Sequence, residues 1–376
     1  MDASRWRFVV EDPLTGMIVA HDLPINGARL TESLNRPGAL SGTVPLADSH
    51  ATAEILSPGR RAIYALRDGV IQWGGPLWTV KVPEGSDEAH IECEGWLGYW
   101  DHRDIWQSRS FTQIEQFDIF KTLIDDAQDE TGTSTVGHAH EGQVDLGISV
   151  TWDTPSGVLR DRIDQYADHQ AKNLGDALRE LAAVEDGFDY SMRYTLYAET
   201  IGKEIRLHYP GRGRDMRGDA SHRFEFEFDT SPTSKTNVID RGVVNDATEQ
   251  AWRIRGWGEG MDATRLRSQS VGHDAGAGYL PVDQAPSWST VAQQSTLNAH
   301  VSRQLSLYQS PARIPSVTVD PNMEPRWGSY GLGDVVPLDI RDISPLSSYG
   351  GPARIVGWSV DVDSDRPSLT FDPVVT

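Results

Sequence analysis

The sequence has one cysteine and no long apolar run, and each shortage excludes a class of protein. Cys93 has no second cysteine to pair with, which excludes an intramolecular disulfide and a zinc site built on paired thiolates. No stretch approaches the roughly 18 apolar residues that cross a bilayer, and residues 1–6 lack the apolar core of a secretion signal. We therefore expect a protein without a membrane span.

Basic residues are also scarce. Lys and Arg number 34 against 55 Asp and Glu, a net charge of −21 over 376 residues. Proteins that grip nucleic acid use Lys and Arg to displace counterions from phosphates, so this balance argues against a specific DNA binder. Aromatic residues are plentiful, with 12 Trp, 11 Tyr and 9 Phe, and they can fill the cores of two or three domains.

Residues 1–108 are typical of short strands separated by turn residues. Strands are expected at 5–11, 16–21, 42–46, 62–67, 70–74, 77–82 and 90–94. Asp68-Gly69 is the strongest local signal, because a two-residue hairpin turn needs positive φ, which Gly adopts at little cost. We predict a first β-barrel-type tube domain here.

Residues 109–234 combine helical and strand patterns. Thr112 and Glu115 suggest a capping box that opens a helix, Thr154-Pro155 suggests the start of a second helix, and Asn173 suggests the cap of a third. Strands are expected at 188–195, 204–209 and 223–229. The sequence therefore predicts an α+β middle domain.

Residues 235–376 return to strands after the polar linker 231–236. Strands are expected at 238–244, 251–257, 316–320, 334–340, 353–361 and 368–371, with one helical insert near 289–308. The predicted fold class is α+β, mainly β: two small antiparallel β-barrel-type tube domains, 1–108 and 235–376, flank the middle domain 109–234.

Two acidic or imidazole clusters could hold a metal, and both favour a plainer interpretation. His138, His140 and Glu141 lie in a polar loop with no helix to fix their geometry. Asp361, Asp363 and Asp365, with Asp372 at the twelfth position, resemble a calcium loop, but Arg366 occupies the place of the turning Gly. We expect an exposed loop and an acidic hairpin, and no metal ligands.

Other motifs also fall short of a site. The run 256–260 resembles a phosphate cradle but lacks the Lys-Ser/Thr end of a P-loop, so a strand end is expected. The basic cluster 211–214 is expected to pair with carboxylates of a neighbouring subunit, and the tripeptide 217–219 matches an integrin motif by chance. Cys93 between two carboxylates would be a poor nucleophile. We predict no catalytic, cofactor-binding or metal-binding residue.

Five tryptophans cluster near the first domain, and we expect most of them to be core residues. They are Trp73, Trp78, Trp96, Trp100 and Trp106.

Three stretches together resemble the tail-tip or baseplate hub proteins of long-tailed bacteriophages of actinobacteria, also called minor tail proteins. The first runs from Leu56-Ser57-Pro58-Gly59 into residues 64–77. The second joins Ala177-Leu178-Arg179-Glu180-Leu181 to Gly187-Phe188-Asp189-Tyr190. The third comprises residues 330–338 and 353–361.

This resemblance implies a structural protein of the virion tail tip, not an enzyme. Three chains would form a homotrimeric ring on the sixfold tail tube, contact distal tail, tape-measure and other minor tail or fibre proteins, and let DNA pass without specific binding. Because two β domains per chain give six surfaces per trimer, duplication would resolve the symmetry mismatch. No cofactor is implied.

Two alternatives remain open from the residues. A cell-wall hydrolase or peptidase-type tail enzyme would need two carboxylates converging in a cleft. A carbohydrate-binding receptor module would need several exposed, coplanar Trp rings.

Overall fold

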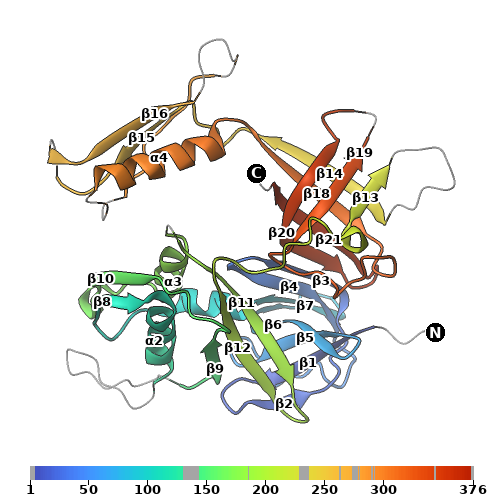
Figure 1. The fold of residues 1–376 in the computed structure, drawn as a ribbon. Helices are drawn as coiled ribbons and strands as arrows, with labels where there is room; N and C mark the ends of the chain where they lie inside the picture. Colours follow the sequence, from blue (N-terminus) through green and yellow to red (C-terminus); the bar gives the residue numbers. More distant parts are fainter. Residues whose placement is uncertain are drawn as a thin grey trace. The chain divides into compact units, whose positions relative to one another are not determined.

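The described part of the chain is mainly β. The structure, a computed structural model, describes residues 5–129, 144–184, 186–227, 237–261, 264–272, 278, 280–288, 291, 293–342 and 344–373. With 46% strand and 15% helix, it confirms the α+β, mainly β class. The sheets formed by these residues are open, and none of them closes into a barrel (Figure 1).

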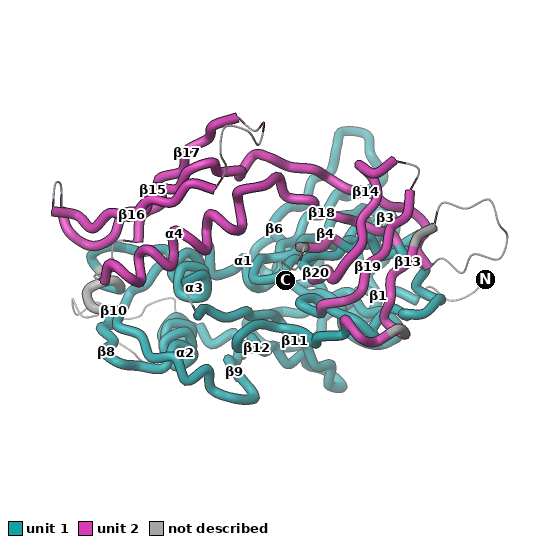
Figure 2. The backbone as a smooth tube through the Cα atoms, turned by 45° about the horizontal axis from the view of Figure 1, so that its top comes forward, with its two compact units in different colours: residues 1–216, 319–334, 355–369 teal, residues 217–318, 335–354, 370–376 magenta. Residues whose placement is uncertain are grey.

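The chain divides into two compact units, coloured separately in Figure 2. Unit 1 comprises residues 1–216, 319–334 and 355–369, and unit 2 comprises residues 217–318, 335–354 and 370–376. Strands β20 (Tyr349–Asp361) and β21 (Arg366–Pro373) therefore each contribute residues to both units. The unit that contains the first strands also contains part of the last ones.

The large sheet of unit 1 is an antiparallel path in the order β20-β3-β4-β7-β6-β5-β1-β2. Its other strands are β1 (Trp6–Asp12), β2 (Met17–Ala20), β3 (Asn26–Ser33), β4 (Arg36–Pro45), β5 (Ala62–Arg67), β6 (Val70–Lys81) and β7 (Glu88–Glu94). Strand β20 pairs with β3, with Gly357 opposite Ser33 and Asp361 opposite Arg29. The late strand β20 thus extends the sheet that the early strands form.

The β5–β6 hairpin confirms the strongest local prediction. Asp68 and Gly69 have φ of 49° and 80°, and Arg67 lies opposite Val70. This is the two-residue turn with positive φ that the dipeptide predicts. The strands expected at 70–74 and 77–82 are one continuous strand, because glycines let it run closely past its neighbours: a Cβ at Gly75 would collide with the Glu94 carbonyl.

The middle part of unit 1 places helices beside a small sheet (Figure 1). Its elements are α1 (Trp96–Tyr99), β8 (Arg109–Glu115), α2 (Gln116–Gln128), β9 (Ile148–Thr151), β10 (Leu159–Tyr166), α3 (Leu174–Ala182), β11 (Asp189–Leu196) and β12 (Ile201–His208). Strand β12 lies between β11 and β9, and β8 pairs with β10 as a two-stranded ribbon. Asn173 caps α3 by accepting the Asp176 N–H, as predicted.

Two helix-start predictions in this region were wrong. Thr112 lies in strand β8, and Glu115 is itself the N-cap of α2, because its carboxylate accepts the N–H groups of Phe117 and Asp118. Thr154-Pro155 starts no helix, since residues 159–166 form strand β10 with Leu159 opposite Glu115. Pairing with a distant strand overrides a local helix signal.

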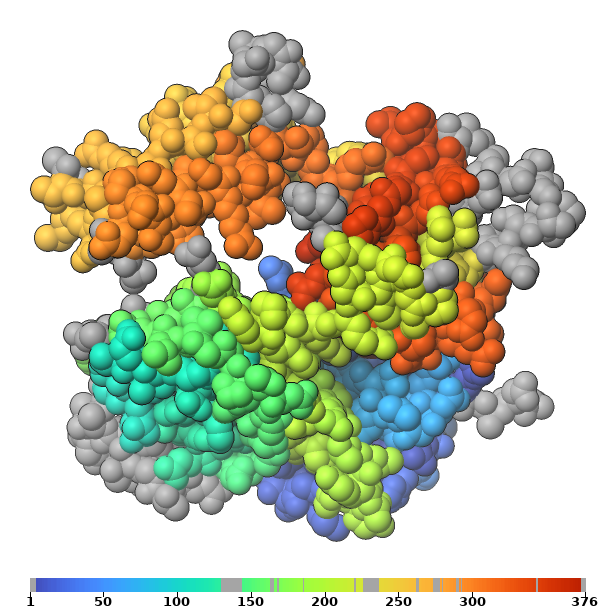
Figure 3. Space-filling view, viewed as in Figure 1, coloured from blue at the N-terminus to red at the C-terminus, as the bar shows by residue number. Residues whose placement is uncertain are grey.

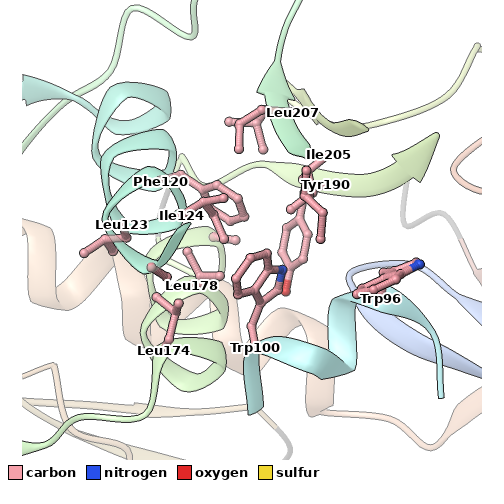
Figure 4. Packing of buried hydrophobic residues seen from close by; sticks show 14 of the residues in the cluster. Trp96, Trp100, Phe120, Leu123, Ile124, Leu174, Leu178, Tyr190, Ile205 and Leu207 are labelled. Atoms are coloured by element: carbon pink, nitrogen blue, oxygen red, sulfur yellow. The ribbon is translucent and has the colours of Figure 1, made fainter. Parts of the chain in front are cut away.

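The helices and the small sheet share one apolar core. Figure 4 shows Phe120 and Ile124 of α2 meeting Leu178 of α3 and Tyr190 and Ile205 of the sheet. Trp96 and Trp100, both 1% exposed, belong to the same cluster. Burying each such large side chain stabilises the fold by about 1.5–3 kcal/mol, so this core fixes the middle part to the adjoining strands.

The strands of unit 2 include a second sheet region, in the order β14-β18-β21-β20-β19-β13. Its additional strands are β13 (Phe224–Glu227), β14 (Val238–Asp246), β18 (Ala312–Val319) and β19 (Val335–Arg341). Strand β13 runs parallel to β19, and Phe224 is fully buried with its ring 6.1 Å from that of Phe371. Strand β13 therefore contributes Phe224 to the core of this sheet.

Unit 2 also contains the helical insert that the sequence predicts. Strands β15 (Arg253–Trp257), β16 (Arg267–Val271) and β17 (Asp283–Gln284) form a small sheet, and helix α4 (Gln294–Tyr308) packs on one face of it. Leu297, Val301 and Leu305 of α4 are buried in a stripe along one face of the helix, and the helical insert predicted near 289–308 is confirmed. Figure 3 shows α4 (orange) directly against the β15–β16 residues (yellow-orange).

Candidate functional site

The turn between β20 and β21 carries a cluster of polar contacts in unit 1. The Asp365 carboxylate accepts two hydrogen bonds from Arg67, Nε at 2.8 Å and Nη2 at 2.7 Å, and one from Trp6 Nε1 at 2.7 Å. Burial acts to raise the pKa of Asp365, but these hydrogen bonds outweigh it and hold the pKa below its usual range. The bidentate pair fixes the late hairpin to strands β1 and β5.

Aromatic contacts extend this junction. The Arg67 guanidinium lies 5.8 Å from the ring centroid of Trp327, and Trp327 Nε1 donates to Gln72 Oε1 at 3.1 Å. The rings of Trp327 and Trp358 meet edge to face at 5.3 Å. One cluster of side chains therefore connects β5, β6, β20 and the loop before β19. Such a cluster holds these segments rigidly together.

In the basic cluster 211–214, Arg214 pairs with a carboxylate of its own chain, and the expected pairing of the cluster with a neighbouring subunit stays a prediction. Arg214 Nη2 lies 2.7 Å from Asp334 Oδ2, and its backbone N–H also donates to Asp334. The backbone N–H of Arg212 donates to Asp189. A Cβ at Gly213 would collide with Gly333, so glycine permits the close approach of these two loops.

A second joint lies in the interior of unit 1. Lys203 Nζ contacts both carboxylate oxygens of Glu11 at 3.0 and 3.2 Å, and the two side chains are 3% and 0% exposed. Tyr64 donates to Glu11 at 2.6 Å, and Trp96 Nε1 donates to Tyr64 at 3.0 Å. Each carboxylate oxygen has a partner, so this buried pair satisfies the geometry that such a pair needs.

Sequence reasoning missed both joints. Arg67 and Asp365 are 298 positions apart, and Lys203 and Glu11 are 192 apart, so no local pattern links them. One signal was present: Glu11 ends the apolar run of a strand whose residues from Phe8 to Glu11 are all buried. A charged residue at the end of such a run indicates a buried partner.

One Ser–His contact resembles the start of a catalytic arrangement. Ser191 Oγ lies 3.2 Å from His208 Nε2, and Ser191 is 6% exposed. Burial, together with Arg212 and Arg206, lowers the pKa of His208 to about 4, which makes it a weak general base at neutral pH. Nearby Asp189 accepts hydrogen bonds from Asn35 and from the Arg212 backbone. We therefore interpret the Ser191–His208 contact as structural and not as part of a catalytic site.

Glu32 is a largely buried acid with a strongly raised pKa. It stands opposite Trp358 in the β3–β20 pairing. Burial raises the pKa of Glu32 to about 7, against the lowering effects of Arg212 and of a hydrogen bond from Trp358. The β3–β20 pairing therefore contains a group that ionises near pH 7.

The two motifs that were weighed as metal sites and interpreted as an acidic hairpin and an exposed loop have different outcomes. The acidic run 361–365 is a hairpin turn, in which the N–H groups of Ser364 and Asp365 donate to the Asp361 carbonyl, as expected. His138, His140 and Glu141 lie outside the described residues. Within the part of the chain that the structure describes, no three His, Cys, Asp or Glu side chains converge on a metal position, and no helix is long and apolar enough to cross a membrane.

The remaining motifs have structural roles. Residues 256–260 span the end of β15, as predicted, and a Cβ at Gly256 would collide with Val301 of α4. In the tripeptide 217–219, Asp219 caps a short turn and contacts His222 at 2.8 Å. Cys93 is buried, and burial first, then Glu92, raises the pKa of its thiol far above the ordinary range. Cys93 is therefore a poor nucleophile, as expected.

The tryptophans divide between core and surface. Trp73, Trp96 and Trp100 are buried, which confirms the core interpretation for these three. Trp78 is half-buried, and Trp106 is 55% exposed.

Comparisons with known proteins place the fold among phage tail proteins. A prophage 43 kDa tail protein from Shewanella oneidensis matches with a TM-score of 0.61 and 12% identity, covering 98% of each chain. A tail protein from Neisseria meningitidis matches with a TM-score of 0.60 and 11% identity, over 98% of this chain and 96% of that one. A prophage tail protein from Listeria monocytogenes gives 0.54 and 14% identity, over 98% and 94%.

No protein-family model and no curated protein sequence matches the chain. At such low identity the structural likeness shows the fold: the chain has the fold of phage tail proteins over nearly its whole length. This confirms, for the fold, the resemblance drawn from the sequence.

Proposed function

We propose that this protein is a structural hub of a bacteriophage tail tip, in which three copies form a ring that continues and closes the tail tube. The single observation that carries the proposal is the likeness to a prophage tail protein over 98% of both chains. Because the likeness is to a tail protein, we infer a role in assembly, without enzymatic turnover.

The joints of unit 1 support such a role. Asp365–Arg67 and Glu11–Lys203 connect segments that lie far apart in the chain, and each pair is hydrogen-bonded and largely buried. A ring subunit that anchors distal tail, tape-measure and fibre proteins must withstand mechanical force without local unfolding. Buried bidentate contacts between distant segments resist such local opening.

The division into domains 1–108, 109–234 and 235–376 belongs to this proposal. Two tube domains per chain would give a trimer six surfaces for a sixfold tube. The net charge of −21 fits a conduit, because carboxylates on the lumen would repel phosphate and let DNA pass without holding it.

Measuring the mass of the purified full chain in solution by light scattering tests the proposal. We expect three times the chain mass of 41.6 kDa and, by electron microscopy, rings with a central opening. A protein that remains a monomer at every concentration would refute the ring. A monomer that hydrolyses peptidoglycan would instead favour the enzyme.

A further inference from the structure

The segment between α1 and β8 holds an exposed tryptophan on a fixed backbone. Trp106 is 55% exposed, whereas its neighbour Ile105 is buried in the core. The N–H of Ile105 donates to the Lys172 carbonyl at 2.9 Å, and the N–H of Leu174 donates to the Arg103 carbonyl at 2.8 Å. These two backbone contacts attach the segment to the start of α3, so the Trp106 ring is presented from a fixed position.

The Trp106 ring borders a small pocket that lies entirely within unit 1. The apolar side of the pocket is formed by Leu123 and Ala127 of α2 and by Leu174 of α3. The pocket encloses about 250 Å³, its open mouth included. Drug-sized ligands occupy pockets of about 300–1,000 Å³, so this shallower site suits a single small ring.

The polar side of the pocket is ordered by an arginine behind it. Gln107 and Asp126 line the pocket, and Arg109 binds both of them. Arg109 Nε and Nη2 donate to the two Asp126 carboxylate oxygens at 2.6 and 2.5 Å, and Nη2 also donates to Gln107 Oε1 at 2.8 Å. Because this bond occupies Gln107 Oε1, the orientation of the amide is fixed and its NH₂ group is available to donate.

The remaining polar group of the pocket is an exposed acceptor. Asp104 lines the pocket, and within the part of the chain that the structure describes its carboxylate has no hydrogen bond or ion pair. Since Arg109 neutralises Asp126, the charge of Asp104 is left over, and the group as a whole is negative. An anionic ligand is therefore disfavoured, and a neutral ligand with hydroxyl groups fits the available donors and acceptors.

We propose that Trp106 and the pocket beside it bind one ring of a neutral saccharide. A pyranose with equatorial hydroxyls has a flat C–H face that packs on an aromatic ring, while its hydroxyls both donate and accept hydrogen bonds. The Asp104 carboxylate and the Gln107 amide supply the matching acceptor and donor. A purely apolar ligand would leave these polar groups unpaired and is excluded by the cost of that desolvation.

This role goes beyond the proposed assembly function and does not depend on the ring of copies. One aromatic ring makes a single subsite rather than a receptor module with several coplanar rings, so we expect a dissociation constant of about 1 mM for one chain. In the proposed trimer, three subsites would hold a repeating polysaccharide more tightly through avidity.

Saturation-transfer NMR on the full chain tests the proposal. The neutral probes are cellotriose, chitotriose and a β-linked galactotriose, and trigalacturonate is the anionic probe. W106A removes the ring, W106F keeps an aromatic face, and D104A removes the exposed acceptor. Y197A is the matched control, because Tyr197 is an aromatic residue of unit 1 that is 59% exposed and does not line the pocket. Circular dichroism checks the fold of each variant, and sedimentation velocity checks its assembly.

We expect saturation transfer to at least one neutral trisaccharide. W106A should weaken that binding by about tenfold or more, D104A by several-fold and W106F by less than W106A, with Y197A unchanged. No transfer to any of the three neutral probes overturns the proposal, as does tighter binding of trigalacturonate or an equal loss in Y197A. A W106A variant that lowers the sedimenting mass but keeps saccharide binding would assign the ring to an interface between copies and overturn it too. A wild type that binds the saccharide as a monomer supports the site and refutes only the ring of copies.

Discussion

The buried Glu11–Lys203 pair offers the sharpest test of the core of unit 1. In E11Q the Lys203 ammonium, 3% exposed, loses its counter-charge while the shape of its partner is kept. Removing one member of a buried pair costs about 3–5 kcal/mol, and because the Gln amide oxygen can still accept from Tyr64 or Lys203, we expect the lower end, about 3 kcal/mol. K203M should cost a similar amount.

The double variant E11Q/K203M distinguishes a coupled pair from two independent losses. With both charges gone, no buried ion is left unpaired. The free energy of unfolding lost in the double variant should therefore be smaller than the sum of the two single losses, by about 2 kcal/mol or more. D125N is the matched control: Lys121 and Asp125 pair at 2.5 Å on the surface of α2, with side chains 42% and 49% exposed. Breaking that pair should cost at most about 0.5 kcal/mol.

Urea unfolding followed by tryptophan fluorescence measures these differences. Trp96 is a local probe, because its ring centroid lies 5.2 Å from Lys203 Nζ and its indole donates to Tyr64. Single variants that each cost less than about 1 kcal/mol, or costs that add fully in the double variant, would contradict the buried, coupled pair described here.

Three further predictions concern single residues. D365N removes the charge that Arg67 binds but keeps a side chain that tolerates the φ of 51° at this position. It should lower the free energy of unfolding by about 2 kcal/mol in the same urea assay. A loss below about 0.5 kcal/mol would show that the contact between Asp365 and Arg67 contributes little to stability. Because the folded-state pKa of Glu32 is raised to about 7, its contribution to stability is present below about pH 4.5 and is lost as the pH rises through 7. E32Q should therefore stabilise the protein by about 1–2 kcal/mol at pH 8, after allowance for partial exposure, and by almost nothing at pH 4. Thermal melts measure this difference, and a substitution that changes the melting temperature equally at both pH values would contradict the prediction. Cys93 should react with iodoacetamide only after unfolding, as mass spectrometry can follow; rapid labelling of the native protein would rule out its burial.

Local features of the fold could be predicted from the sequence because their causes are local. The Asp68-Gly69 turn, the Asn173 cap and the buried stripe of α4 each depend on residues within one or two turns of chain. The same logic failed at Thr112, where the helix is capped by Glu115 and the preceding residues pair with β10. Thr112 and Glu115, three residues apart, could each cap the helix, and the pairing of β8 with the distant strand β10 decided between them.

Long-range features could not be predicted in this way. Two examples are the pairing of β20 with β3 and the contact of Asp365 with Arg67. Both depend on which distant segments pack against each other, and a single sequence contains no local pattern that identifies such contacts. The acidic run 361–365 illustrates the point. Its spacing suggested a cation, and the cation it binds is the guanidinium group of Arg67, supplied by the chain itself.

Salt should separate folding from assembly, because the two depend on differently exposed charges. Arg67 is 7% exposed and Lys203 3%, and each contacts its carboxylate directly, so added salt screens these pairs little. Exposed charges are screened more strongly: Arg255 is 51% exposed, so any attraction that such a charge contributes between copies of the proposed ring falls as the Debye length shortens from about 10 Å at 0.1 M to about 3 Å at 1 M salt. Near 1 M sodium chloride we expect the sedimenting mass to fall towards that of one chain while near-ultraviolet circular dichroism stays native. An assembly that resists this salt concentration would require an apolar interface in place of the charged one.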